Sequence, residues 1–425
     1  MRIATFQADV TPPPGSPIYT GIAKSIVDPL EARGIVLMGA GKPVVIAAVD
    51  WCEIRNRSYD LWRDQLAAAA GTTRASVLLS CVHQHDAPYT DMEAQRLLDE
   101  VKSQDKLHDP AFEARAVANV AGALRKSLSN ATPVTEIGTG QAQVEQVASN
   151  RRYVQPNGKV SFGRTSATRD AAIRNMPEGL IDPMLKCISF WNGGRAVAAL
   201  HCYSTHPMSY YGQGDVSADF VGMGRRRMQA EAKDTFHVYF SGASGDTMAG
   251  RYNDGSPQNR PVLADRMYQG MRNTFASAKR APLRELTVRN AKLVFEPRRT
   301  KGFSDAEMRA LLNDPKTPRR ARLDAALGIS WYRRLARKQP VDVPALHLGP
   351  ASIVLVPAEA FVQYQLWAQQ LRPSNLVMTL GYGECAPGYI PTSEAVAEGY
   401  DDHYSWVDFA QCERALRAAL ATALQ

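Results

Sequence analysis

The segment Leu79-Ser80-Cys81-Val82-His83-Gln84-His85-Asp86 places two histidines directly after a mostly apolar run. In extended backbone, the side chains of residues i and i+2 point to the same face. The two imidazoles therefore leave the predicted strand end on one side, where both can bind a metal, or one binds and the other carries protons. Only eight histidines occur in the chain, and two more cluster at His201 and His206. This repetition favours a metal site over a pair of surface histidines.

Apolar patterning around this segment predicts an α/β (mixed) fold. Strands are predicted at 34–38, 43–50, 76–81, 184–191, 196–203, 236–240, 286–295, 343–347, 352–356 and 376–380, and helices at 59–70, 111–128, 218–232, 265–278, 361–371 and 408–424. Tight turns, at Gly39 to Lys42 and at Asn192-Gly193-Gly194, join some of the strands. Layered mixed β-sheets flanked by helices fit this pattern better than an all-parallel barrel. No sequence repeat and no linker divides the chain, so residues 1–425 are predicted to form one domain.

The formal net charge of +8 raises the question of a nucleic-acid partner. Many of the basic residues lie between Arg298 and Lys338. We interpret residues of about 300–340 as a basic helical insertion with an exposed, solvated face. A phosphate-binding patch is the alternative, but no nucleic-acid-binding motif accompanies the run, so no nucleic acid is expected as a partner.

Two further features bear on the compartment of the protein. No apolar run approaches the roughly 18 residues of a membrane span, so stable membrane insertion is not expected. No secretory signal is visible at the N-terminus, which favours a cytoplasmic protein unless a leader has been removed. The six cysteines form no CxxC pair and are expected to be small buried residues rather than a disulfide framework.

Further chemistry-bearing residues follow other predicted strands. His206 is held in extended or turn backbone by Pro207 and is a candidate ligand. Asp215 and Asp219 could orient a histidine, although Asp219 also suits a helix N-terminus. Glu359 comes directly after an apolar strand, where a glutamate often only favours the dipole of the next helix.

Two loops remain open in their interpretation. The glycine-rich turn from Gly242 to Thr247 follows a strand, and its backbone amides could face a developing oxyanion. A simple tight turn explains the same residues. Tyr389 lies between two prolines, where a packed loop aromatic is the simpler reading.

Taken together, the motifs resemble the catalytic domain of the neutral/alkaline (non-lysosomal) ceramidases and their bacterial relatives. The resemblance runs nearly end to end, through Ala8-Asp9-Val10-Thr11-Pro12-Pro13, Asp28-Pro29-Leu30, the strand ending at Asp50, His83 with His85, Asn150-Arg151-Arg152, His206-Pro207, Ser217-Ala218-Asp219, Gly245-Asp246, Pro357-Ala358-Glu359 and Gly388-Tyr389-Ile390-Pro391-Thr392. It implies one catalytic zinc bound by two histidines, a glutamate and a tyrosine, which match His83, His206, Glu359 and Tyr389. His85 is similar to a family residue near the substrate that helps with proton transfer.

The sequence departs from the true ceramidases in two ways. Their Gly-Asp-Val-Ser-Pro-Asn motif, whose serine is implicated in catalysis, is replaced here by residues 245–250, with Met248 at the serine position and Thr247 beside it. Their C-terminal β-domain also has no counterpart in this sequence. The resemblance therefore implies the metal and the hydrolysis more strongly than it implies ceramide.

These observations predict a zinc-dependent amidase that cleaves an N-acyl bond of a small-molecule substrate by metal-activated water. His85 is the expected proton carrier, Asp219 the orienting carboxylate and Thr247 part of the oxyanion-supporting turn. Three alternatives stay open: hydrolysis of an ester or sugar-linked bond, a non-catalytic ligand-binding descendant, and an amidohydrolase barrel. The barrel would carry its HxH motif on the first strand, whereas at least two predicted strands precede it here.

Overall fold

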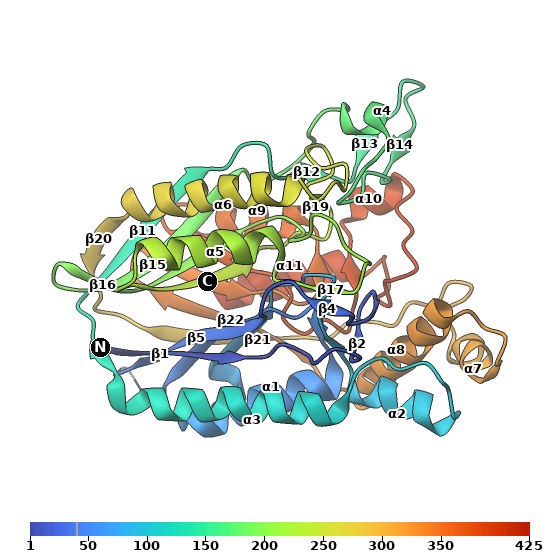
Figure 1. Cartoon of the computed structure of the whole chain (residues 1–425), viewed down its shortest axis with the longest axis horizontal. Coiled ribbons are helices and arrows are strands. Elements are labelled where there is room, and N and C mark those ends of the chain that lie inside the picture. Colours follow the sequence, from blue (N-terminus) through green and yellow to red (C-terminus); the bar gives the residue numbers. More distant parts are fainter. Residues whose placement is uncertain (40) are drawn as a thin grey trace.

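The computed structural model describes residues 1–39 and 41–425, and its largest elements are three β-sheets. The fold is mixed α/β, as expected, with helices on the outer faces of the sheets (Figure 1). One residue of the predicted turn from Gly39 to Lys42, Ala40, lies outside the described residues.

All three sheets contain the same four-stranded topology. The first has β1 (Arg2–Asp9), β5 (Glu31–Met38), β6 (Val44–Val49) and β8 (Val77–Cys81); the second has β11 (Glu136–Gln143), β15 (Met184–Asn192), β16 (Arg195–Tyr203) and β18 (Phe236–Ser241); the third has β21 (Thr287–Leu293), β22 (Val341–Leu348), β23 (Ala351–Leu355) and β25 (Leu376–Leu380). In each, two antiparallel pairings are followed by one parallel pairing. The chain thus repeats a β-β-β-α-β unit three times, although its sequence shows no repeat.

A helix makes the crossover between the two parallel strands of each unit, and a second helix follows the unit. The crossovers are α1 (Asn56–Ala70), α5 (Asp219–Glu231) and α9 (Val362–Leu371), and the following helices are α3 (Pro110–Ser127), α6 (Asn259–Ala276) and α11 (Cys412–Leu424). Antiparallel strands need only a tight turn, whereas parallel strands need such a crossover. In Figure 1, α1 and α3 lie along the lower edge of the molecule, and α6 lies in its upper part with α5 below it.

The remaining elements are short or lie outside the three units. Strands β10 (Thr132–Pro133) and β20 (Lys279–Pro282) extend the first and second sheets. Two-stranded ladders are formed by β2 (Pro17–Ile18) with β3 (Gly21–Ile22), β4 (Ser25–Ile26) with β17 (Asp215–Val216), β7 (Glu53–Ile54) with β9 (Tyr89–Thr90), β12 (Ser149–Asn150) with β19 (Thr247–Met248), β13 (Tyr153–Val154) with β14 (Val160–Ser161), and β24 (Glu359–Ala360) with β26 (Tyr389–Ile390). The other helices are α2 (Met92–Glu100), α4 (Ala171–Arg174), α7 (Asp305–Asn313), α8 (Arg319–Ala336) and α10 (Ser393–Ala397), with two 3-10 turns at Arg74–Ser76 and Leu128–Asn130.

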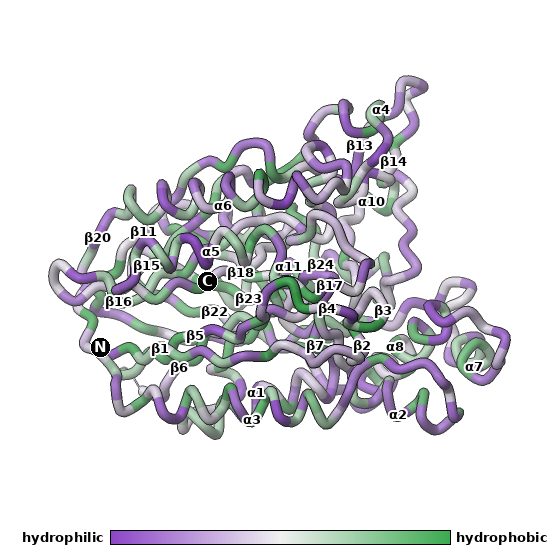
Figure 2. Tube along the Cα trace, in the orientation of Figure 1, coloured by the Kyte–Doolittle hydropathy of each residue, from purple (hydrophilic) through white to green (hydrophobic). Residues whose placement is uncertain are grey.

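The three sheets share one central core. Ile46 of the first sheet, Leu200 of the second and Ile353 of the third belong to the same buried cluster. These strands are covered on both faces, which explains their continuous apolar runs. The outer helices alternate hydrophobic and hydrophilic residues along their length (Figure 2), as expected for helices with one face in the core. This packing fixes the strand ends from which the candidate site is built.

Most predicted elements are confirmed, with boundaries shifted by a few residues. Strands β1 and β11 and helix α2 were missing from the prediction. Neither strand shows a long apolar run: both alternate buried with half-buried or exposed residues near one end. Their place in the sheets comes from pairing with β5 and β15, which are distant in sequence.

The basic segment at about 300–340 is helical, but the expectation of an exposed helix is wrong for α8. Its residues Leu323, Leu327 and Trp331 are buried in a core cluster because they recur at helical spacing. The arginines flanking this stripe bind carboxylates of the protein: Arg333 lies 3.0 Å from Glu93 of α2. The basic run therefore serves packing, with its charges largely paired inside the chain.

Candidate metal centre

Three site residues follow the carboxyl ends of the parallel strand pairs, one from each sheet. His83 comes two residues after β8, His206 three after β16, and Glu359, in β24, four after β23. Parallel strands end at the same edge of their sheet, so each unit delivers its residue to one edge. Because the three sheets share a core, these edges meet.

The three side chains converge on one point. The Glu359 Oε2 atom lies 3.0 Å from His206 Nε2 and 3.4 Å from His83 Nε2. One ligand atom from each residue lies within 4.8 Å of the other two, and all three residues are buried. Two imidazole nitrogens and a carboxylate oxygen at this spacing are a donor set that suits a divalent cation such as zinc.

Backbone carbonyls set the orientation of both imidazoles. His83 Nδ1 lies 2.9 Å from the carbonyl oxygen of Cys52, and His206 Nδ1 lies 2.6 Å from that of Ser244. A carbonyl only accepts, so each Nδ1 carries the proton and each Nε2 presents a lone pair to Glu359. Within the described chain, the buried His83 Nε2 has no hydrogen-bond partner. This orphaned lone pair fits a metal ligand.

The electrostatics of the cluster point the same way. Burial raises the pKa of Glu359, but the two imidazoles outweigh burial and hold this pKa well below its usual range. Burial likewise lowers the pKa of His83, and the Glu359 carboxylate reverses the effect and leaves it raised. The pKa of His206 stays lowered, chiefly by burial. The Glu359 carboxylate is therefore a buried negative charge that favours positive charge beside it, from a protonated His83 or from a metal ion.

Strained backbone surrounds the centre. His83 (φ 78°), Ala358 (φ 53°) and Tyr382 (φ 54°) are all in the left-handed region, which costs about 1–3 kcal/mol per non-glycine residue. The ring of Tyr382 stacks on His83, with 4.1 Å between centroids. Gly245 is required for a different reason, since a Cβ there would lie 2.1 Å from the carbonyl oxygen of Glu359. Strained residues of this kind cluster at functional sites, so they support a functional role for the His83, His206 and Glu359 cluster.

Backbone pairing places Tyr389 opposite Glu359 of the cluster. Glu359 and Tyr389 are directly opposite each other in the parallel ladder of β24 and β26. The ring of Tyr389 lies nearly parallel to that of His206, with 6.4 Å between centroids. Burial and the Glu359 charge raise the pKa of Tyr389 well above its usual value, so the free phenol is protonated. The structure thus places Tyr389 beside the three other proposed ligands.

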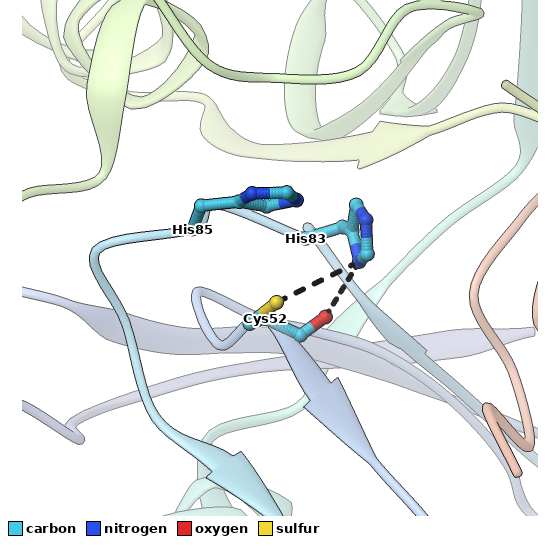
Figure 3. Close-up of side chains that lie close together, drawn as sticks. All are labelled: Cys52, His83 and His85. Atoms are coloured by element: carbon cyan, nitrogen blue, oxygen red, sulfur yellow. Dashed lines mark hydrogen bonds between the residues drawn. The ribbon is translucent and has the colours of Figure 1, made fainter. Parts of the chain in front are cut away.

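His85 lies beside His83, and Figure 3 shows its ring next to that of His83 above Cys52. Its ring centroid is 5.1 Å from that of His83 and 6.1 Å from that of His206. Burial and the neighbouring imidazoles hold the pKa of His85 well below its usual value, so it is neutral at pH 7. Its Nδ1 has no partner within the described chain.

Cys52, His83 and His85 form a second group of potential ligand atoms. The Cys52 Sγ atom lies 4.0 Å from His83 Nδ1 (Figure 3), but that nitrogen carries the proton donated to the Cys52 carbonyl. Burial also raises the pKa of the Cys52 thiol well above its usual value. Because His83 Nδ1 carries a proton and is bound to the Cys52 carbonyl, it is not free as a ligand, and this second group fits a metal less well than the first.

A cavity of about 210 Å³ opens beside the centre. It is lined by Tyr19, His85, Arg151, Thr165, Ser166, His206, Met208, Tyr211, Met248, Arg320, Tyr389, Asp402, His403 and Tyr404. His85, His206 and Tyr389 therefore face one space large enough for a small group of a substrate. Met248, at the serine position of the resembling family, lines the same space.

Thr247 does not line this cavity, and four amides of the predicted oxyanion turn are engaged within the protein. The Thr247 hydroxyl lies 3.2 Å from that of Ser204 and is buried. The backbone amides of Gly242, Ala243, Gly245 and Thr247 all donate to acceptors of the protein. Amides already engaged cannot receive an oxyanion. The turn instead orients His206 through its carbonyl oxygens.

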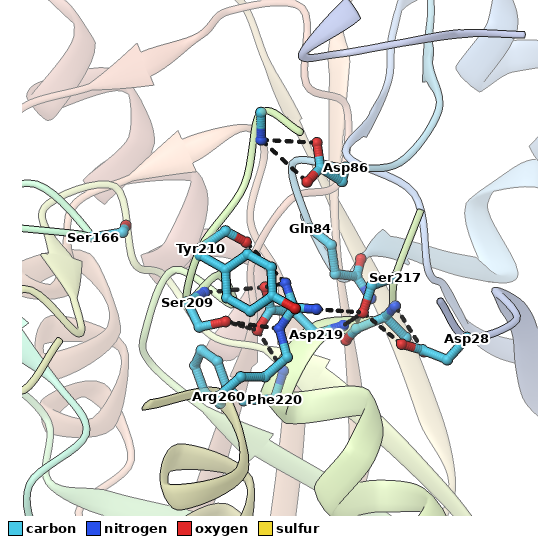
Figure 4. Close-up of polar contacts among 12 residues, drawn as sticks. Asp28, Gln84, Asp86, Ser166, Ser209, Tyr210, Ser217, Asp219, Phe220 and Arg260 are labelled. Atoms are coloured by element: carbon cyan, nitrogen blue, oxygen red, sulfur yellow. Dashed lines mark hydrogen bonds and ion pairs between the residues drawn. The ribbon is translucent and has the colours of Figure 1, made fainter. Parts of the chain in front are cut away.

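Asp219 is also not placed to orient a ligand histidine. Its carboxylate accepts from the backbone and hydroxyl of Ser209 and lies 3.2 Å from Arg260 (Figure 4). Ser217, two residues before it, donates to Asp28. This polar network holds the loop after His206 in place. In the described structure no hydrogen bond joins Asp219 to a histidine, and backbone carbonyls fill the orienting role instead.

Sequence reasoning missed several residues of the site. Arg151 was part of the Asn-Arg-Arg motif but had no assigned role, and Arg320 was read as part of a solvated helix face. Tyr19, Tyr211 and Tyr382 carried no local signal at all. They come from distant loops, so only the arrangement of the three sheets brings them together.

The fold and this centre define a mixed α/β protein with a buried His-His-Glu cluster at the meeting point of three sheets. The chain matches no family model and no curated protein sequence. Among solved structures it is similar to neutral ceramidase from Pseudomonas aeruginosa, with a TM-score of 0.72, 15% identity, and coverage of 100% of this chain and 74% of that one. It is similar to a structure described as ceramidase complexed with C2 at a TM-score of 0.71, 15% identity and the same coverage. The ceramidase-like fold expected from the motifs is therefore confirmed.

Proposed function

We propose that the protein is a metal-dependent hydrolase of amide bonds, with zinc held by His83, His206, Glu359 and Tyr389. The observation that carries this proposal is the convergence of two oriented Nε2 lone pairs on the buried carboxylate oxygen of Glu359. The second support is the likeness in fold to neutral ceramidase, whose name denotes cleavage of the amide bond of ceramide. Retention of all four ligand-type residues argues against a descendant that only binds a ligand.

A bound zinc ion supplies a Lewis acid and lowers the pKa of water to about 7. The protein's own part is to position and to move protons. His85 is neutral and lines the cavity, so it can accept a proton from the attacking water and pass it to the leaving nitrogen. The phenol of Tyr19 remains protonated because burial raises its pKa, and it can donate a hydrogen bond to a substrate oxygen.

Cavity size restricts the substrate. The cavity of about 210 Å³ is smaller than the roughly 300–1,000 Å³ of a typical ligand pocket. It can therefore hold only a small part of the substrate around the reacting bond. No helix in residues 1–39 and 41–425 combines the length and apolar character needed to cross a membrane. Because of the small cavity, the proposed substrate class is a small N-acyl compound.

The test is metal content together with turnover. Purified wild-type protein should contain about one zinc ion per chain by elemental analysis. It should release a carboxylic acid from at least one member of a panel of N-acyl amides. Chelation should abolish this turnover, and added zinc should restore it.

Two matched variants make the test specific. Glu359→Gln keeps the size of the side chain but removes the charge, and it should lose both metal and activity. Asp219→Asn alters a buried carboxylate outside the centre and should retain metal. A wild-type protein that neither contains nor takes up a divalent metal would refute the proposal.

A further inference from the structure

Arg151 brings a half-buried guanidinium without an ion-pair partner to the candidate site. It follows β12, and its guanidinium lines the cavity 5.2 Å from the centroid of Tyr389. Its Nε and Nη1 atoms are buried and have no hydrogen-bond partner in the described structure. No carboxylate oxygen of a described residue lies within 4.0 Å of this guanidinium, whereas most other buried arginines of the chain are ion-paired. Two buried guanidinium nitrogens without an acceptor are costly, so the site favours an anionic acceptor beside Arg151.

Arg320 adds a second cation from a different element. It lies in the first turn of α8 and lines the same cavity. Of its guanidinium nitrogens, only Nε is ion-paired, at 3.0 Å from the Asp324 carboxylate. Its guanidinium lies 4.9 Å from the ring centroid of Tyr19 and 5.0 Å from that of Tyr404, which hold it over the cavity. Within the described chain, the two terminal nitrogens of Arg320 make no hydrogen bond.

The acidic groups around the cavity leave these cations unneutralised. Asp402 accepts from the backbone of Tyr404 and lies 3.5 Å from the exposed His403. Asp324 pairs with Arg320 through one nitrogen only. Glu359 belongs to the metal cluster. With a divalent cation in the centre, the cavity has an excess of positive charge, which an uncharged substrate would not complement.

We propose that the substrate carries a carboxylate close to the scissile amide, and that Arg151 and Arg320 bind it. This inference rests on the proposed amide hydrolysis. A planar guanidinium matches the two oxygens of a carboxylate, and two such groups can share one anion. The substrate class is therefore an N-acylated compound with a carboxylate on its amine half, as in N-acyl amino acids, or on its acyl half, as in N-succinyl amines.

The first experiment compares matched charged and neutral substrates. One arm contains N-acetyl amino acids, a second contains N-succinyl amines, and the neutral control contains N-acetyl amino alcohols, in which CH₂OH replaces the carboxylate. The zinc-loaded wild type should prefer one carboxylate arm over the alcohols by at least about tenfold in kcat/KM. The preferred arm identifies which half of the substrate carries the anion.

Arg320→Gln tests the role of the helix α8 cation. KM for the preferred carboxylate should rise about tenfold with little change in kcat, and kinetics with the alcohols should change less than about twofold. Arg320→Lys should recover part of the loss. Arg319→Gln is the control, because this neighbour makes the same charge change while its guanidinium donates to Lys106 and lies outside the cavity.

A binding measurement separates this inference from the proposed function. Calorimetric titration of chelated protein with N-acetylleucine should give a Kd that Arg320→Gln weakens about tenfold and Arg319→Gln leaves unchanged. If no amide is cleaved but this binding is seen, the proposed function fails and the anion subsite stands. If alcohols and carboxylates are cleaved equally well and Arg320→Gln changes neither, the subsite is refuted while the hydrolase remains.

Discussion

Two groups of buried histidines lie in the described structure, and only one of them converges on a carboxylate. His83 and His206 converge on a carboxylate, with their Nδ1 atoms bound to backbone carbonyls. His201 and His237 instead bond each other, with 2.9 Å between Nε2 and Nδ1 and their rings stacked. No carboxylate of a described residue lies within 4.0 Å of that second pair. Burial and proximity of imidazoles therefore do not make a metal site.

The difference follows from where each histidine lies relative to its strand. His201 is inside β16 and His237 inside β18, so their side chains are confined to a face of one sheet. His83 and His206 lie just beyond strand ends, where the chain is free to turn toward residues of other sheets. The sequence placed His201 and His206 in one cluster, and the structure separates them into these two groups.

The largest expected effect comes from comparing His206→Ala with His201→Ala. His206→Ala removes one of the converging ligand atoms, so bound zinc should fall from about one ion per chain to near zero. His201→Ala should keep the zinc and lose about 1–3 kcal/mol of unfolding free energy, because it leaves His237 without its partner. Elemental analysis and urea unfolding measure the two quantities. Loss of zinc from both variants would erase the distinction between the two groups.

His85→Ala should separate metal binding from proton transfer. His85 adjoins the centre without sharing the point at which the three ligand atoms meet. Zinc content should be unchanged, while kcat falls about 10²- to 10⁴-fold through loss of the proton carrier. Single-turnover kinetics on zinc-loaded protein measure this loss. Full turnover in the variant would show that His85 plays no part in proton transfer.

The pH dependence of stability should reveal the second histidine pair. Burial, followed by the charges of Arg33 and Arg225, lowers the pKa of His237 to about 3. Below pH 6.5 the unfolded chain binds a proton that the folded protein excludes, so stability falls as the pH drops from about 6.5 toward 3. At pH 4.5 the loss from this one group is about 2–3 kcal/mol relative to pH 7.5.

Urea unfolding of chelated protein at these two pH values checks this expectation. The variant carrying His201→Phe and His237→Phe removes both groups while keeping stacked rings. Its stability should fall less between pH 7.5 and 4.5 than that of the wild type. An identical decrease in the two proteins would contradict the assignment of the pair as neutral and buried.

The smallest expected effect is that of Thr247→Val. The Thr247 hydroxyl bonds Ser204 and lies outside the cavity. Turnover should stay within about twofold of wild type, and unfolding free energy should fall by about 1 kcal/mol. Activity assays and urea unfolding on the same preparation measure both. A large loss of kcat with normal metal content would restore Thr247 to the reaction.

Local pattern was enough to predict much of the fold and part of the site. Hydrophobic periodicity identified three of the four strands in the first two sheets, all four in the third, and the three crossover helices, because side-chain spacing within one element depends only on nearby residues. Histidines after strand ends were recognisable for the same reason. Tyr389 required the resemblance to a known family, since its meaning depends on backbone pairing with Glu359, 30 positions earlier in the chain.

What only the tertiary structure decided is which of these side chains meet. The threefold repeat of one topology, the packing of α8 into the core and the unpaired Arg151 all depend on contacts between residues far apart in sequence. The same holds for the failures at Thr247 and Asp219, whose side chains are satisfied by Ser204 and by Ser209 with Arg260. Periodicity determines which face of an element is buried, whereas the direction of a loop side chain depends on the elements that surround it.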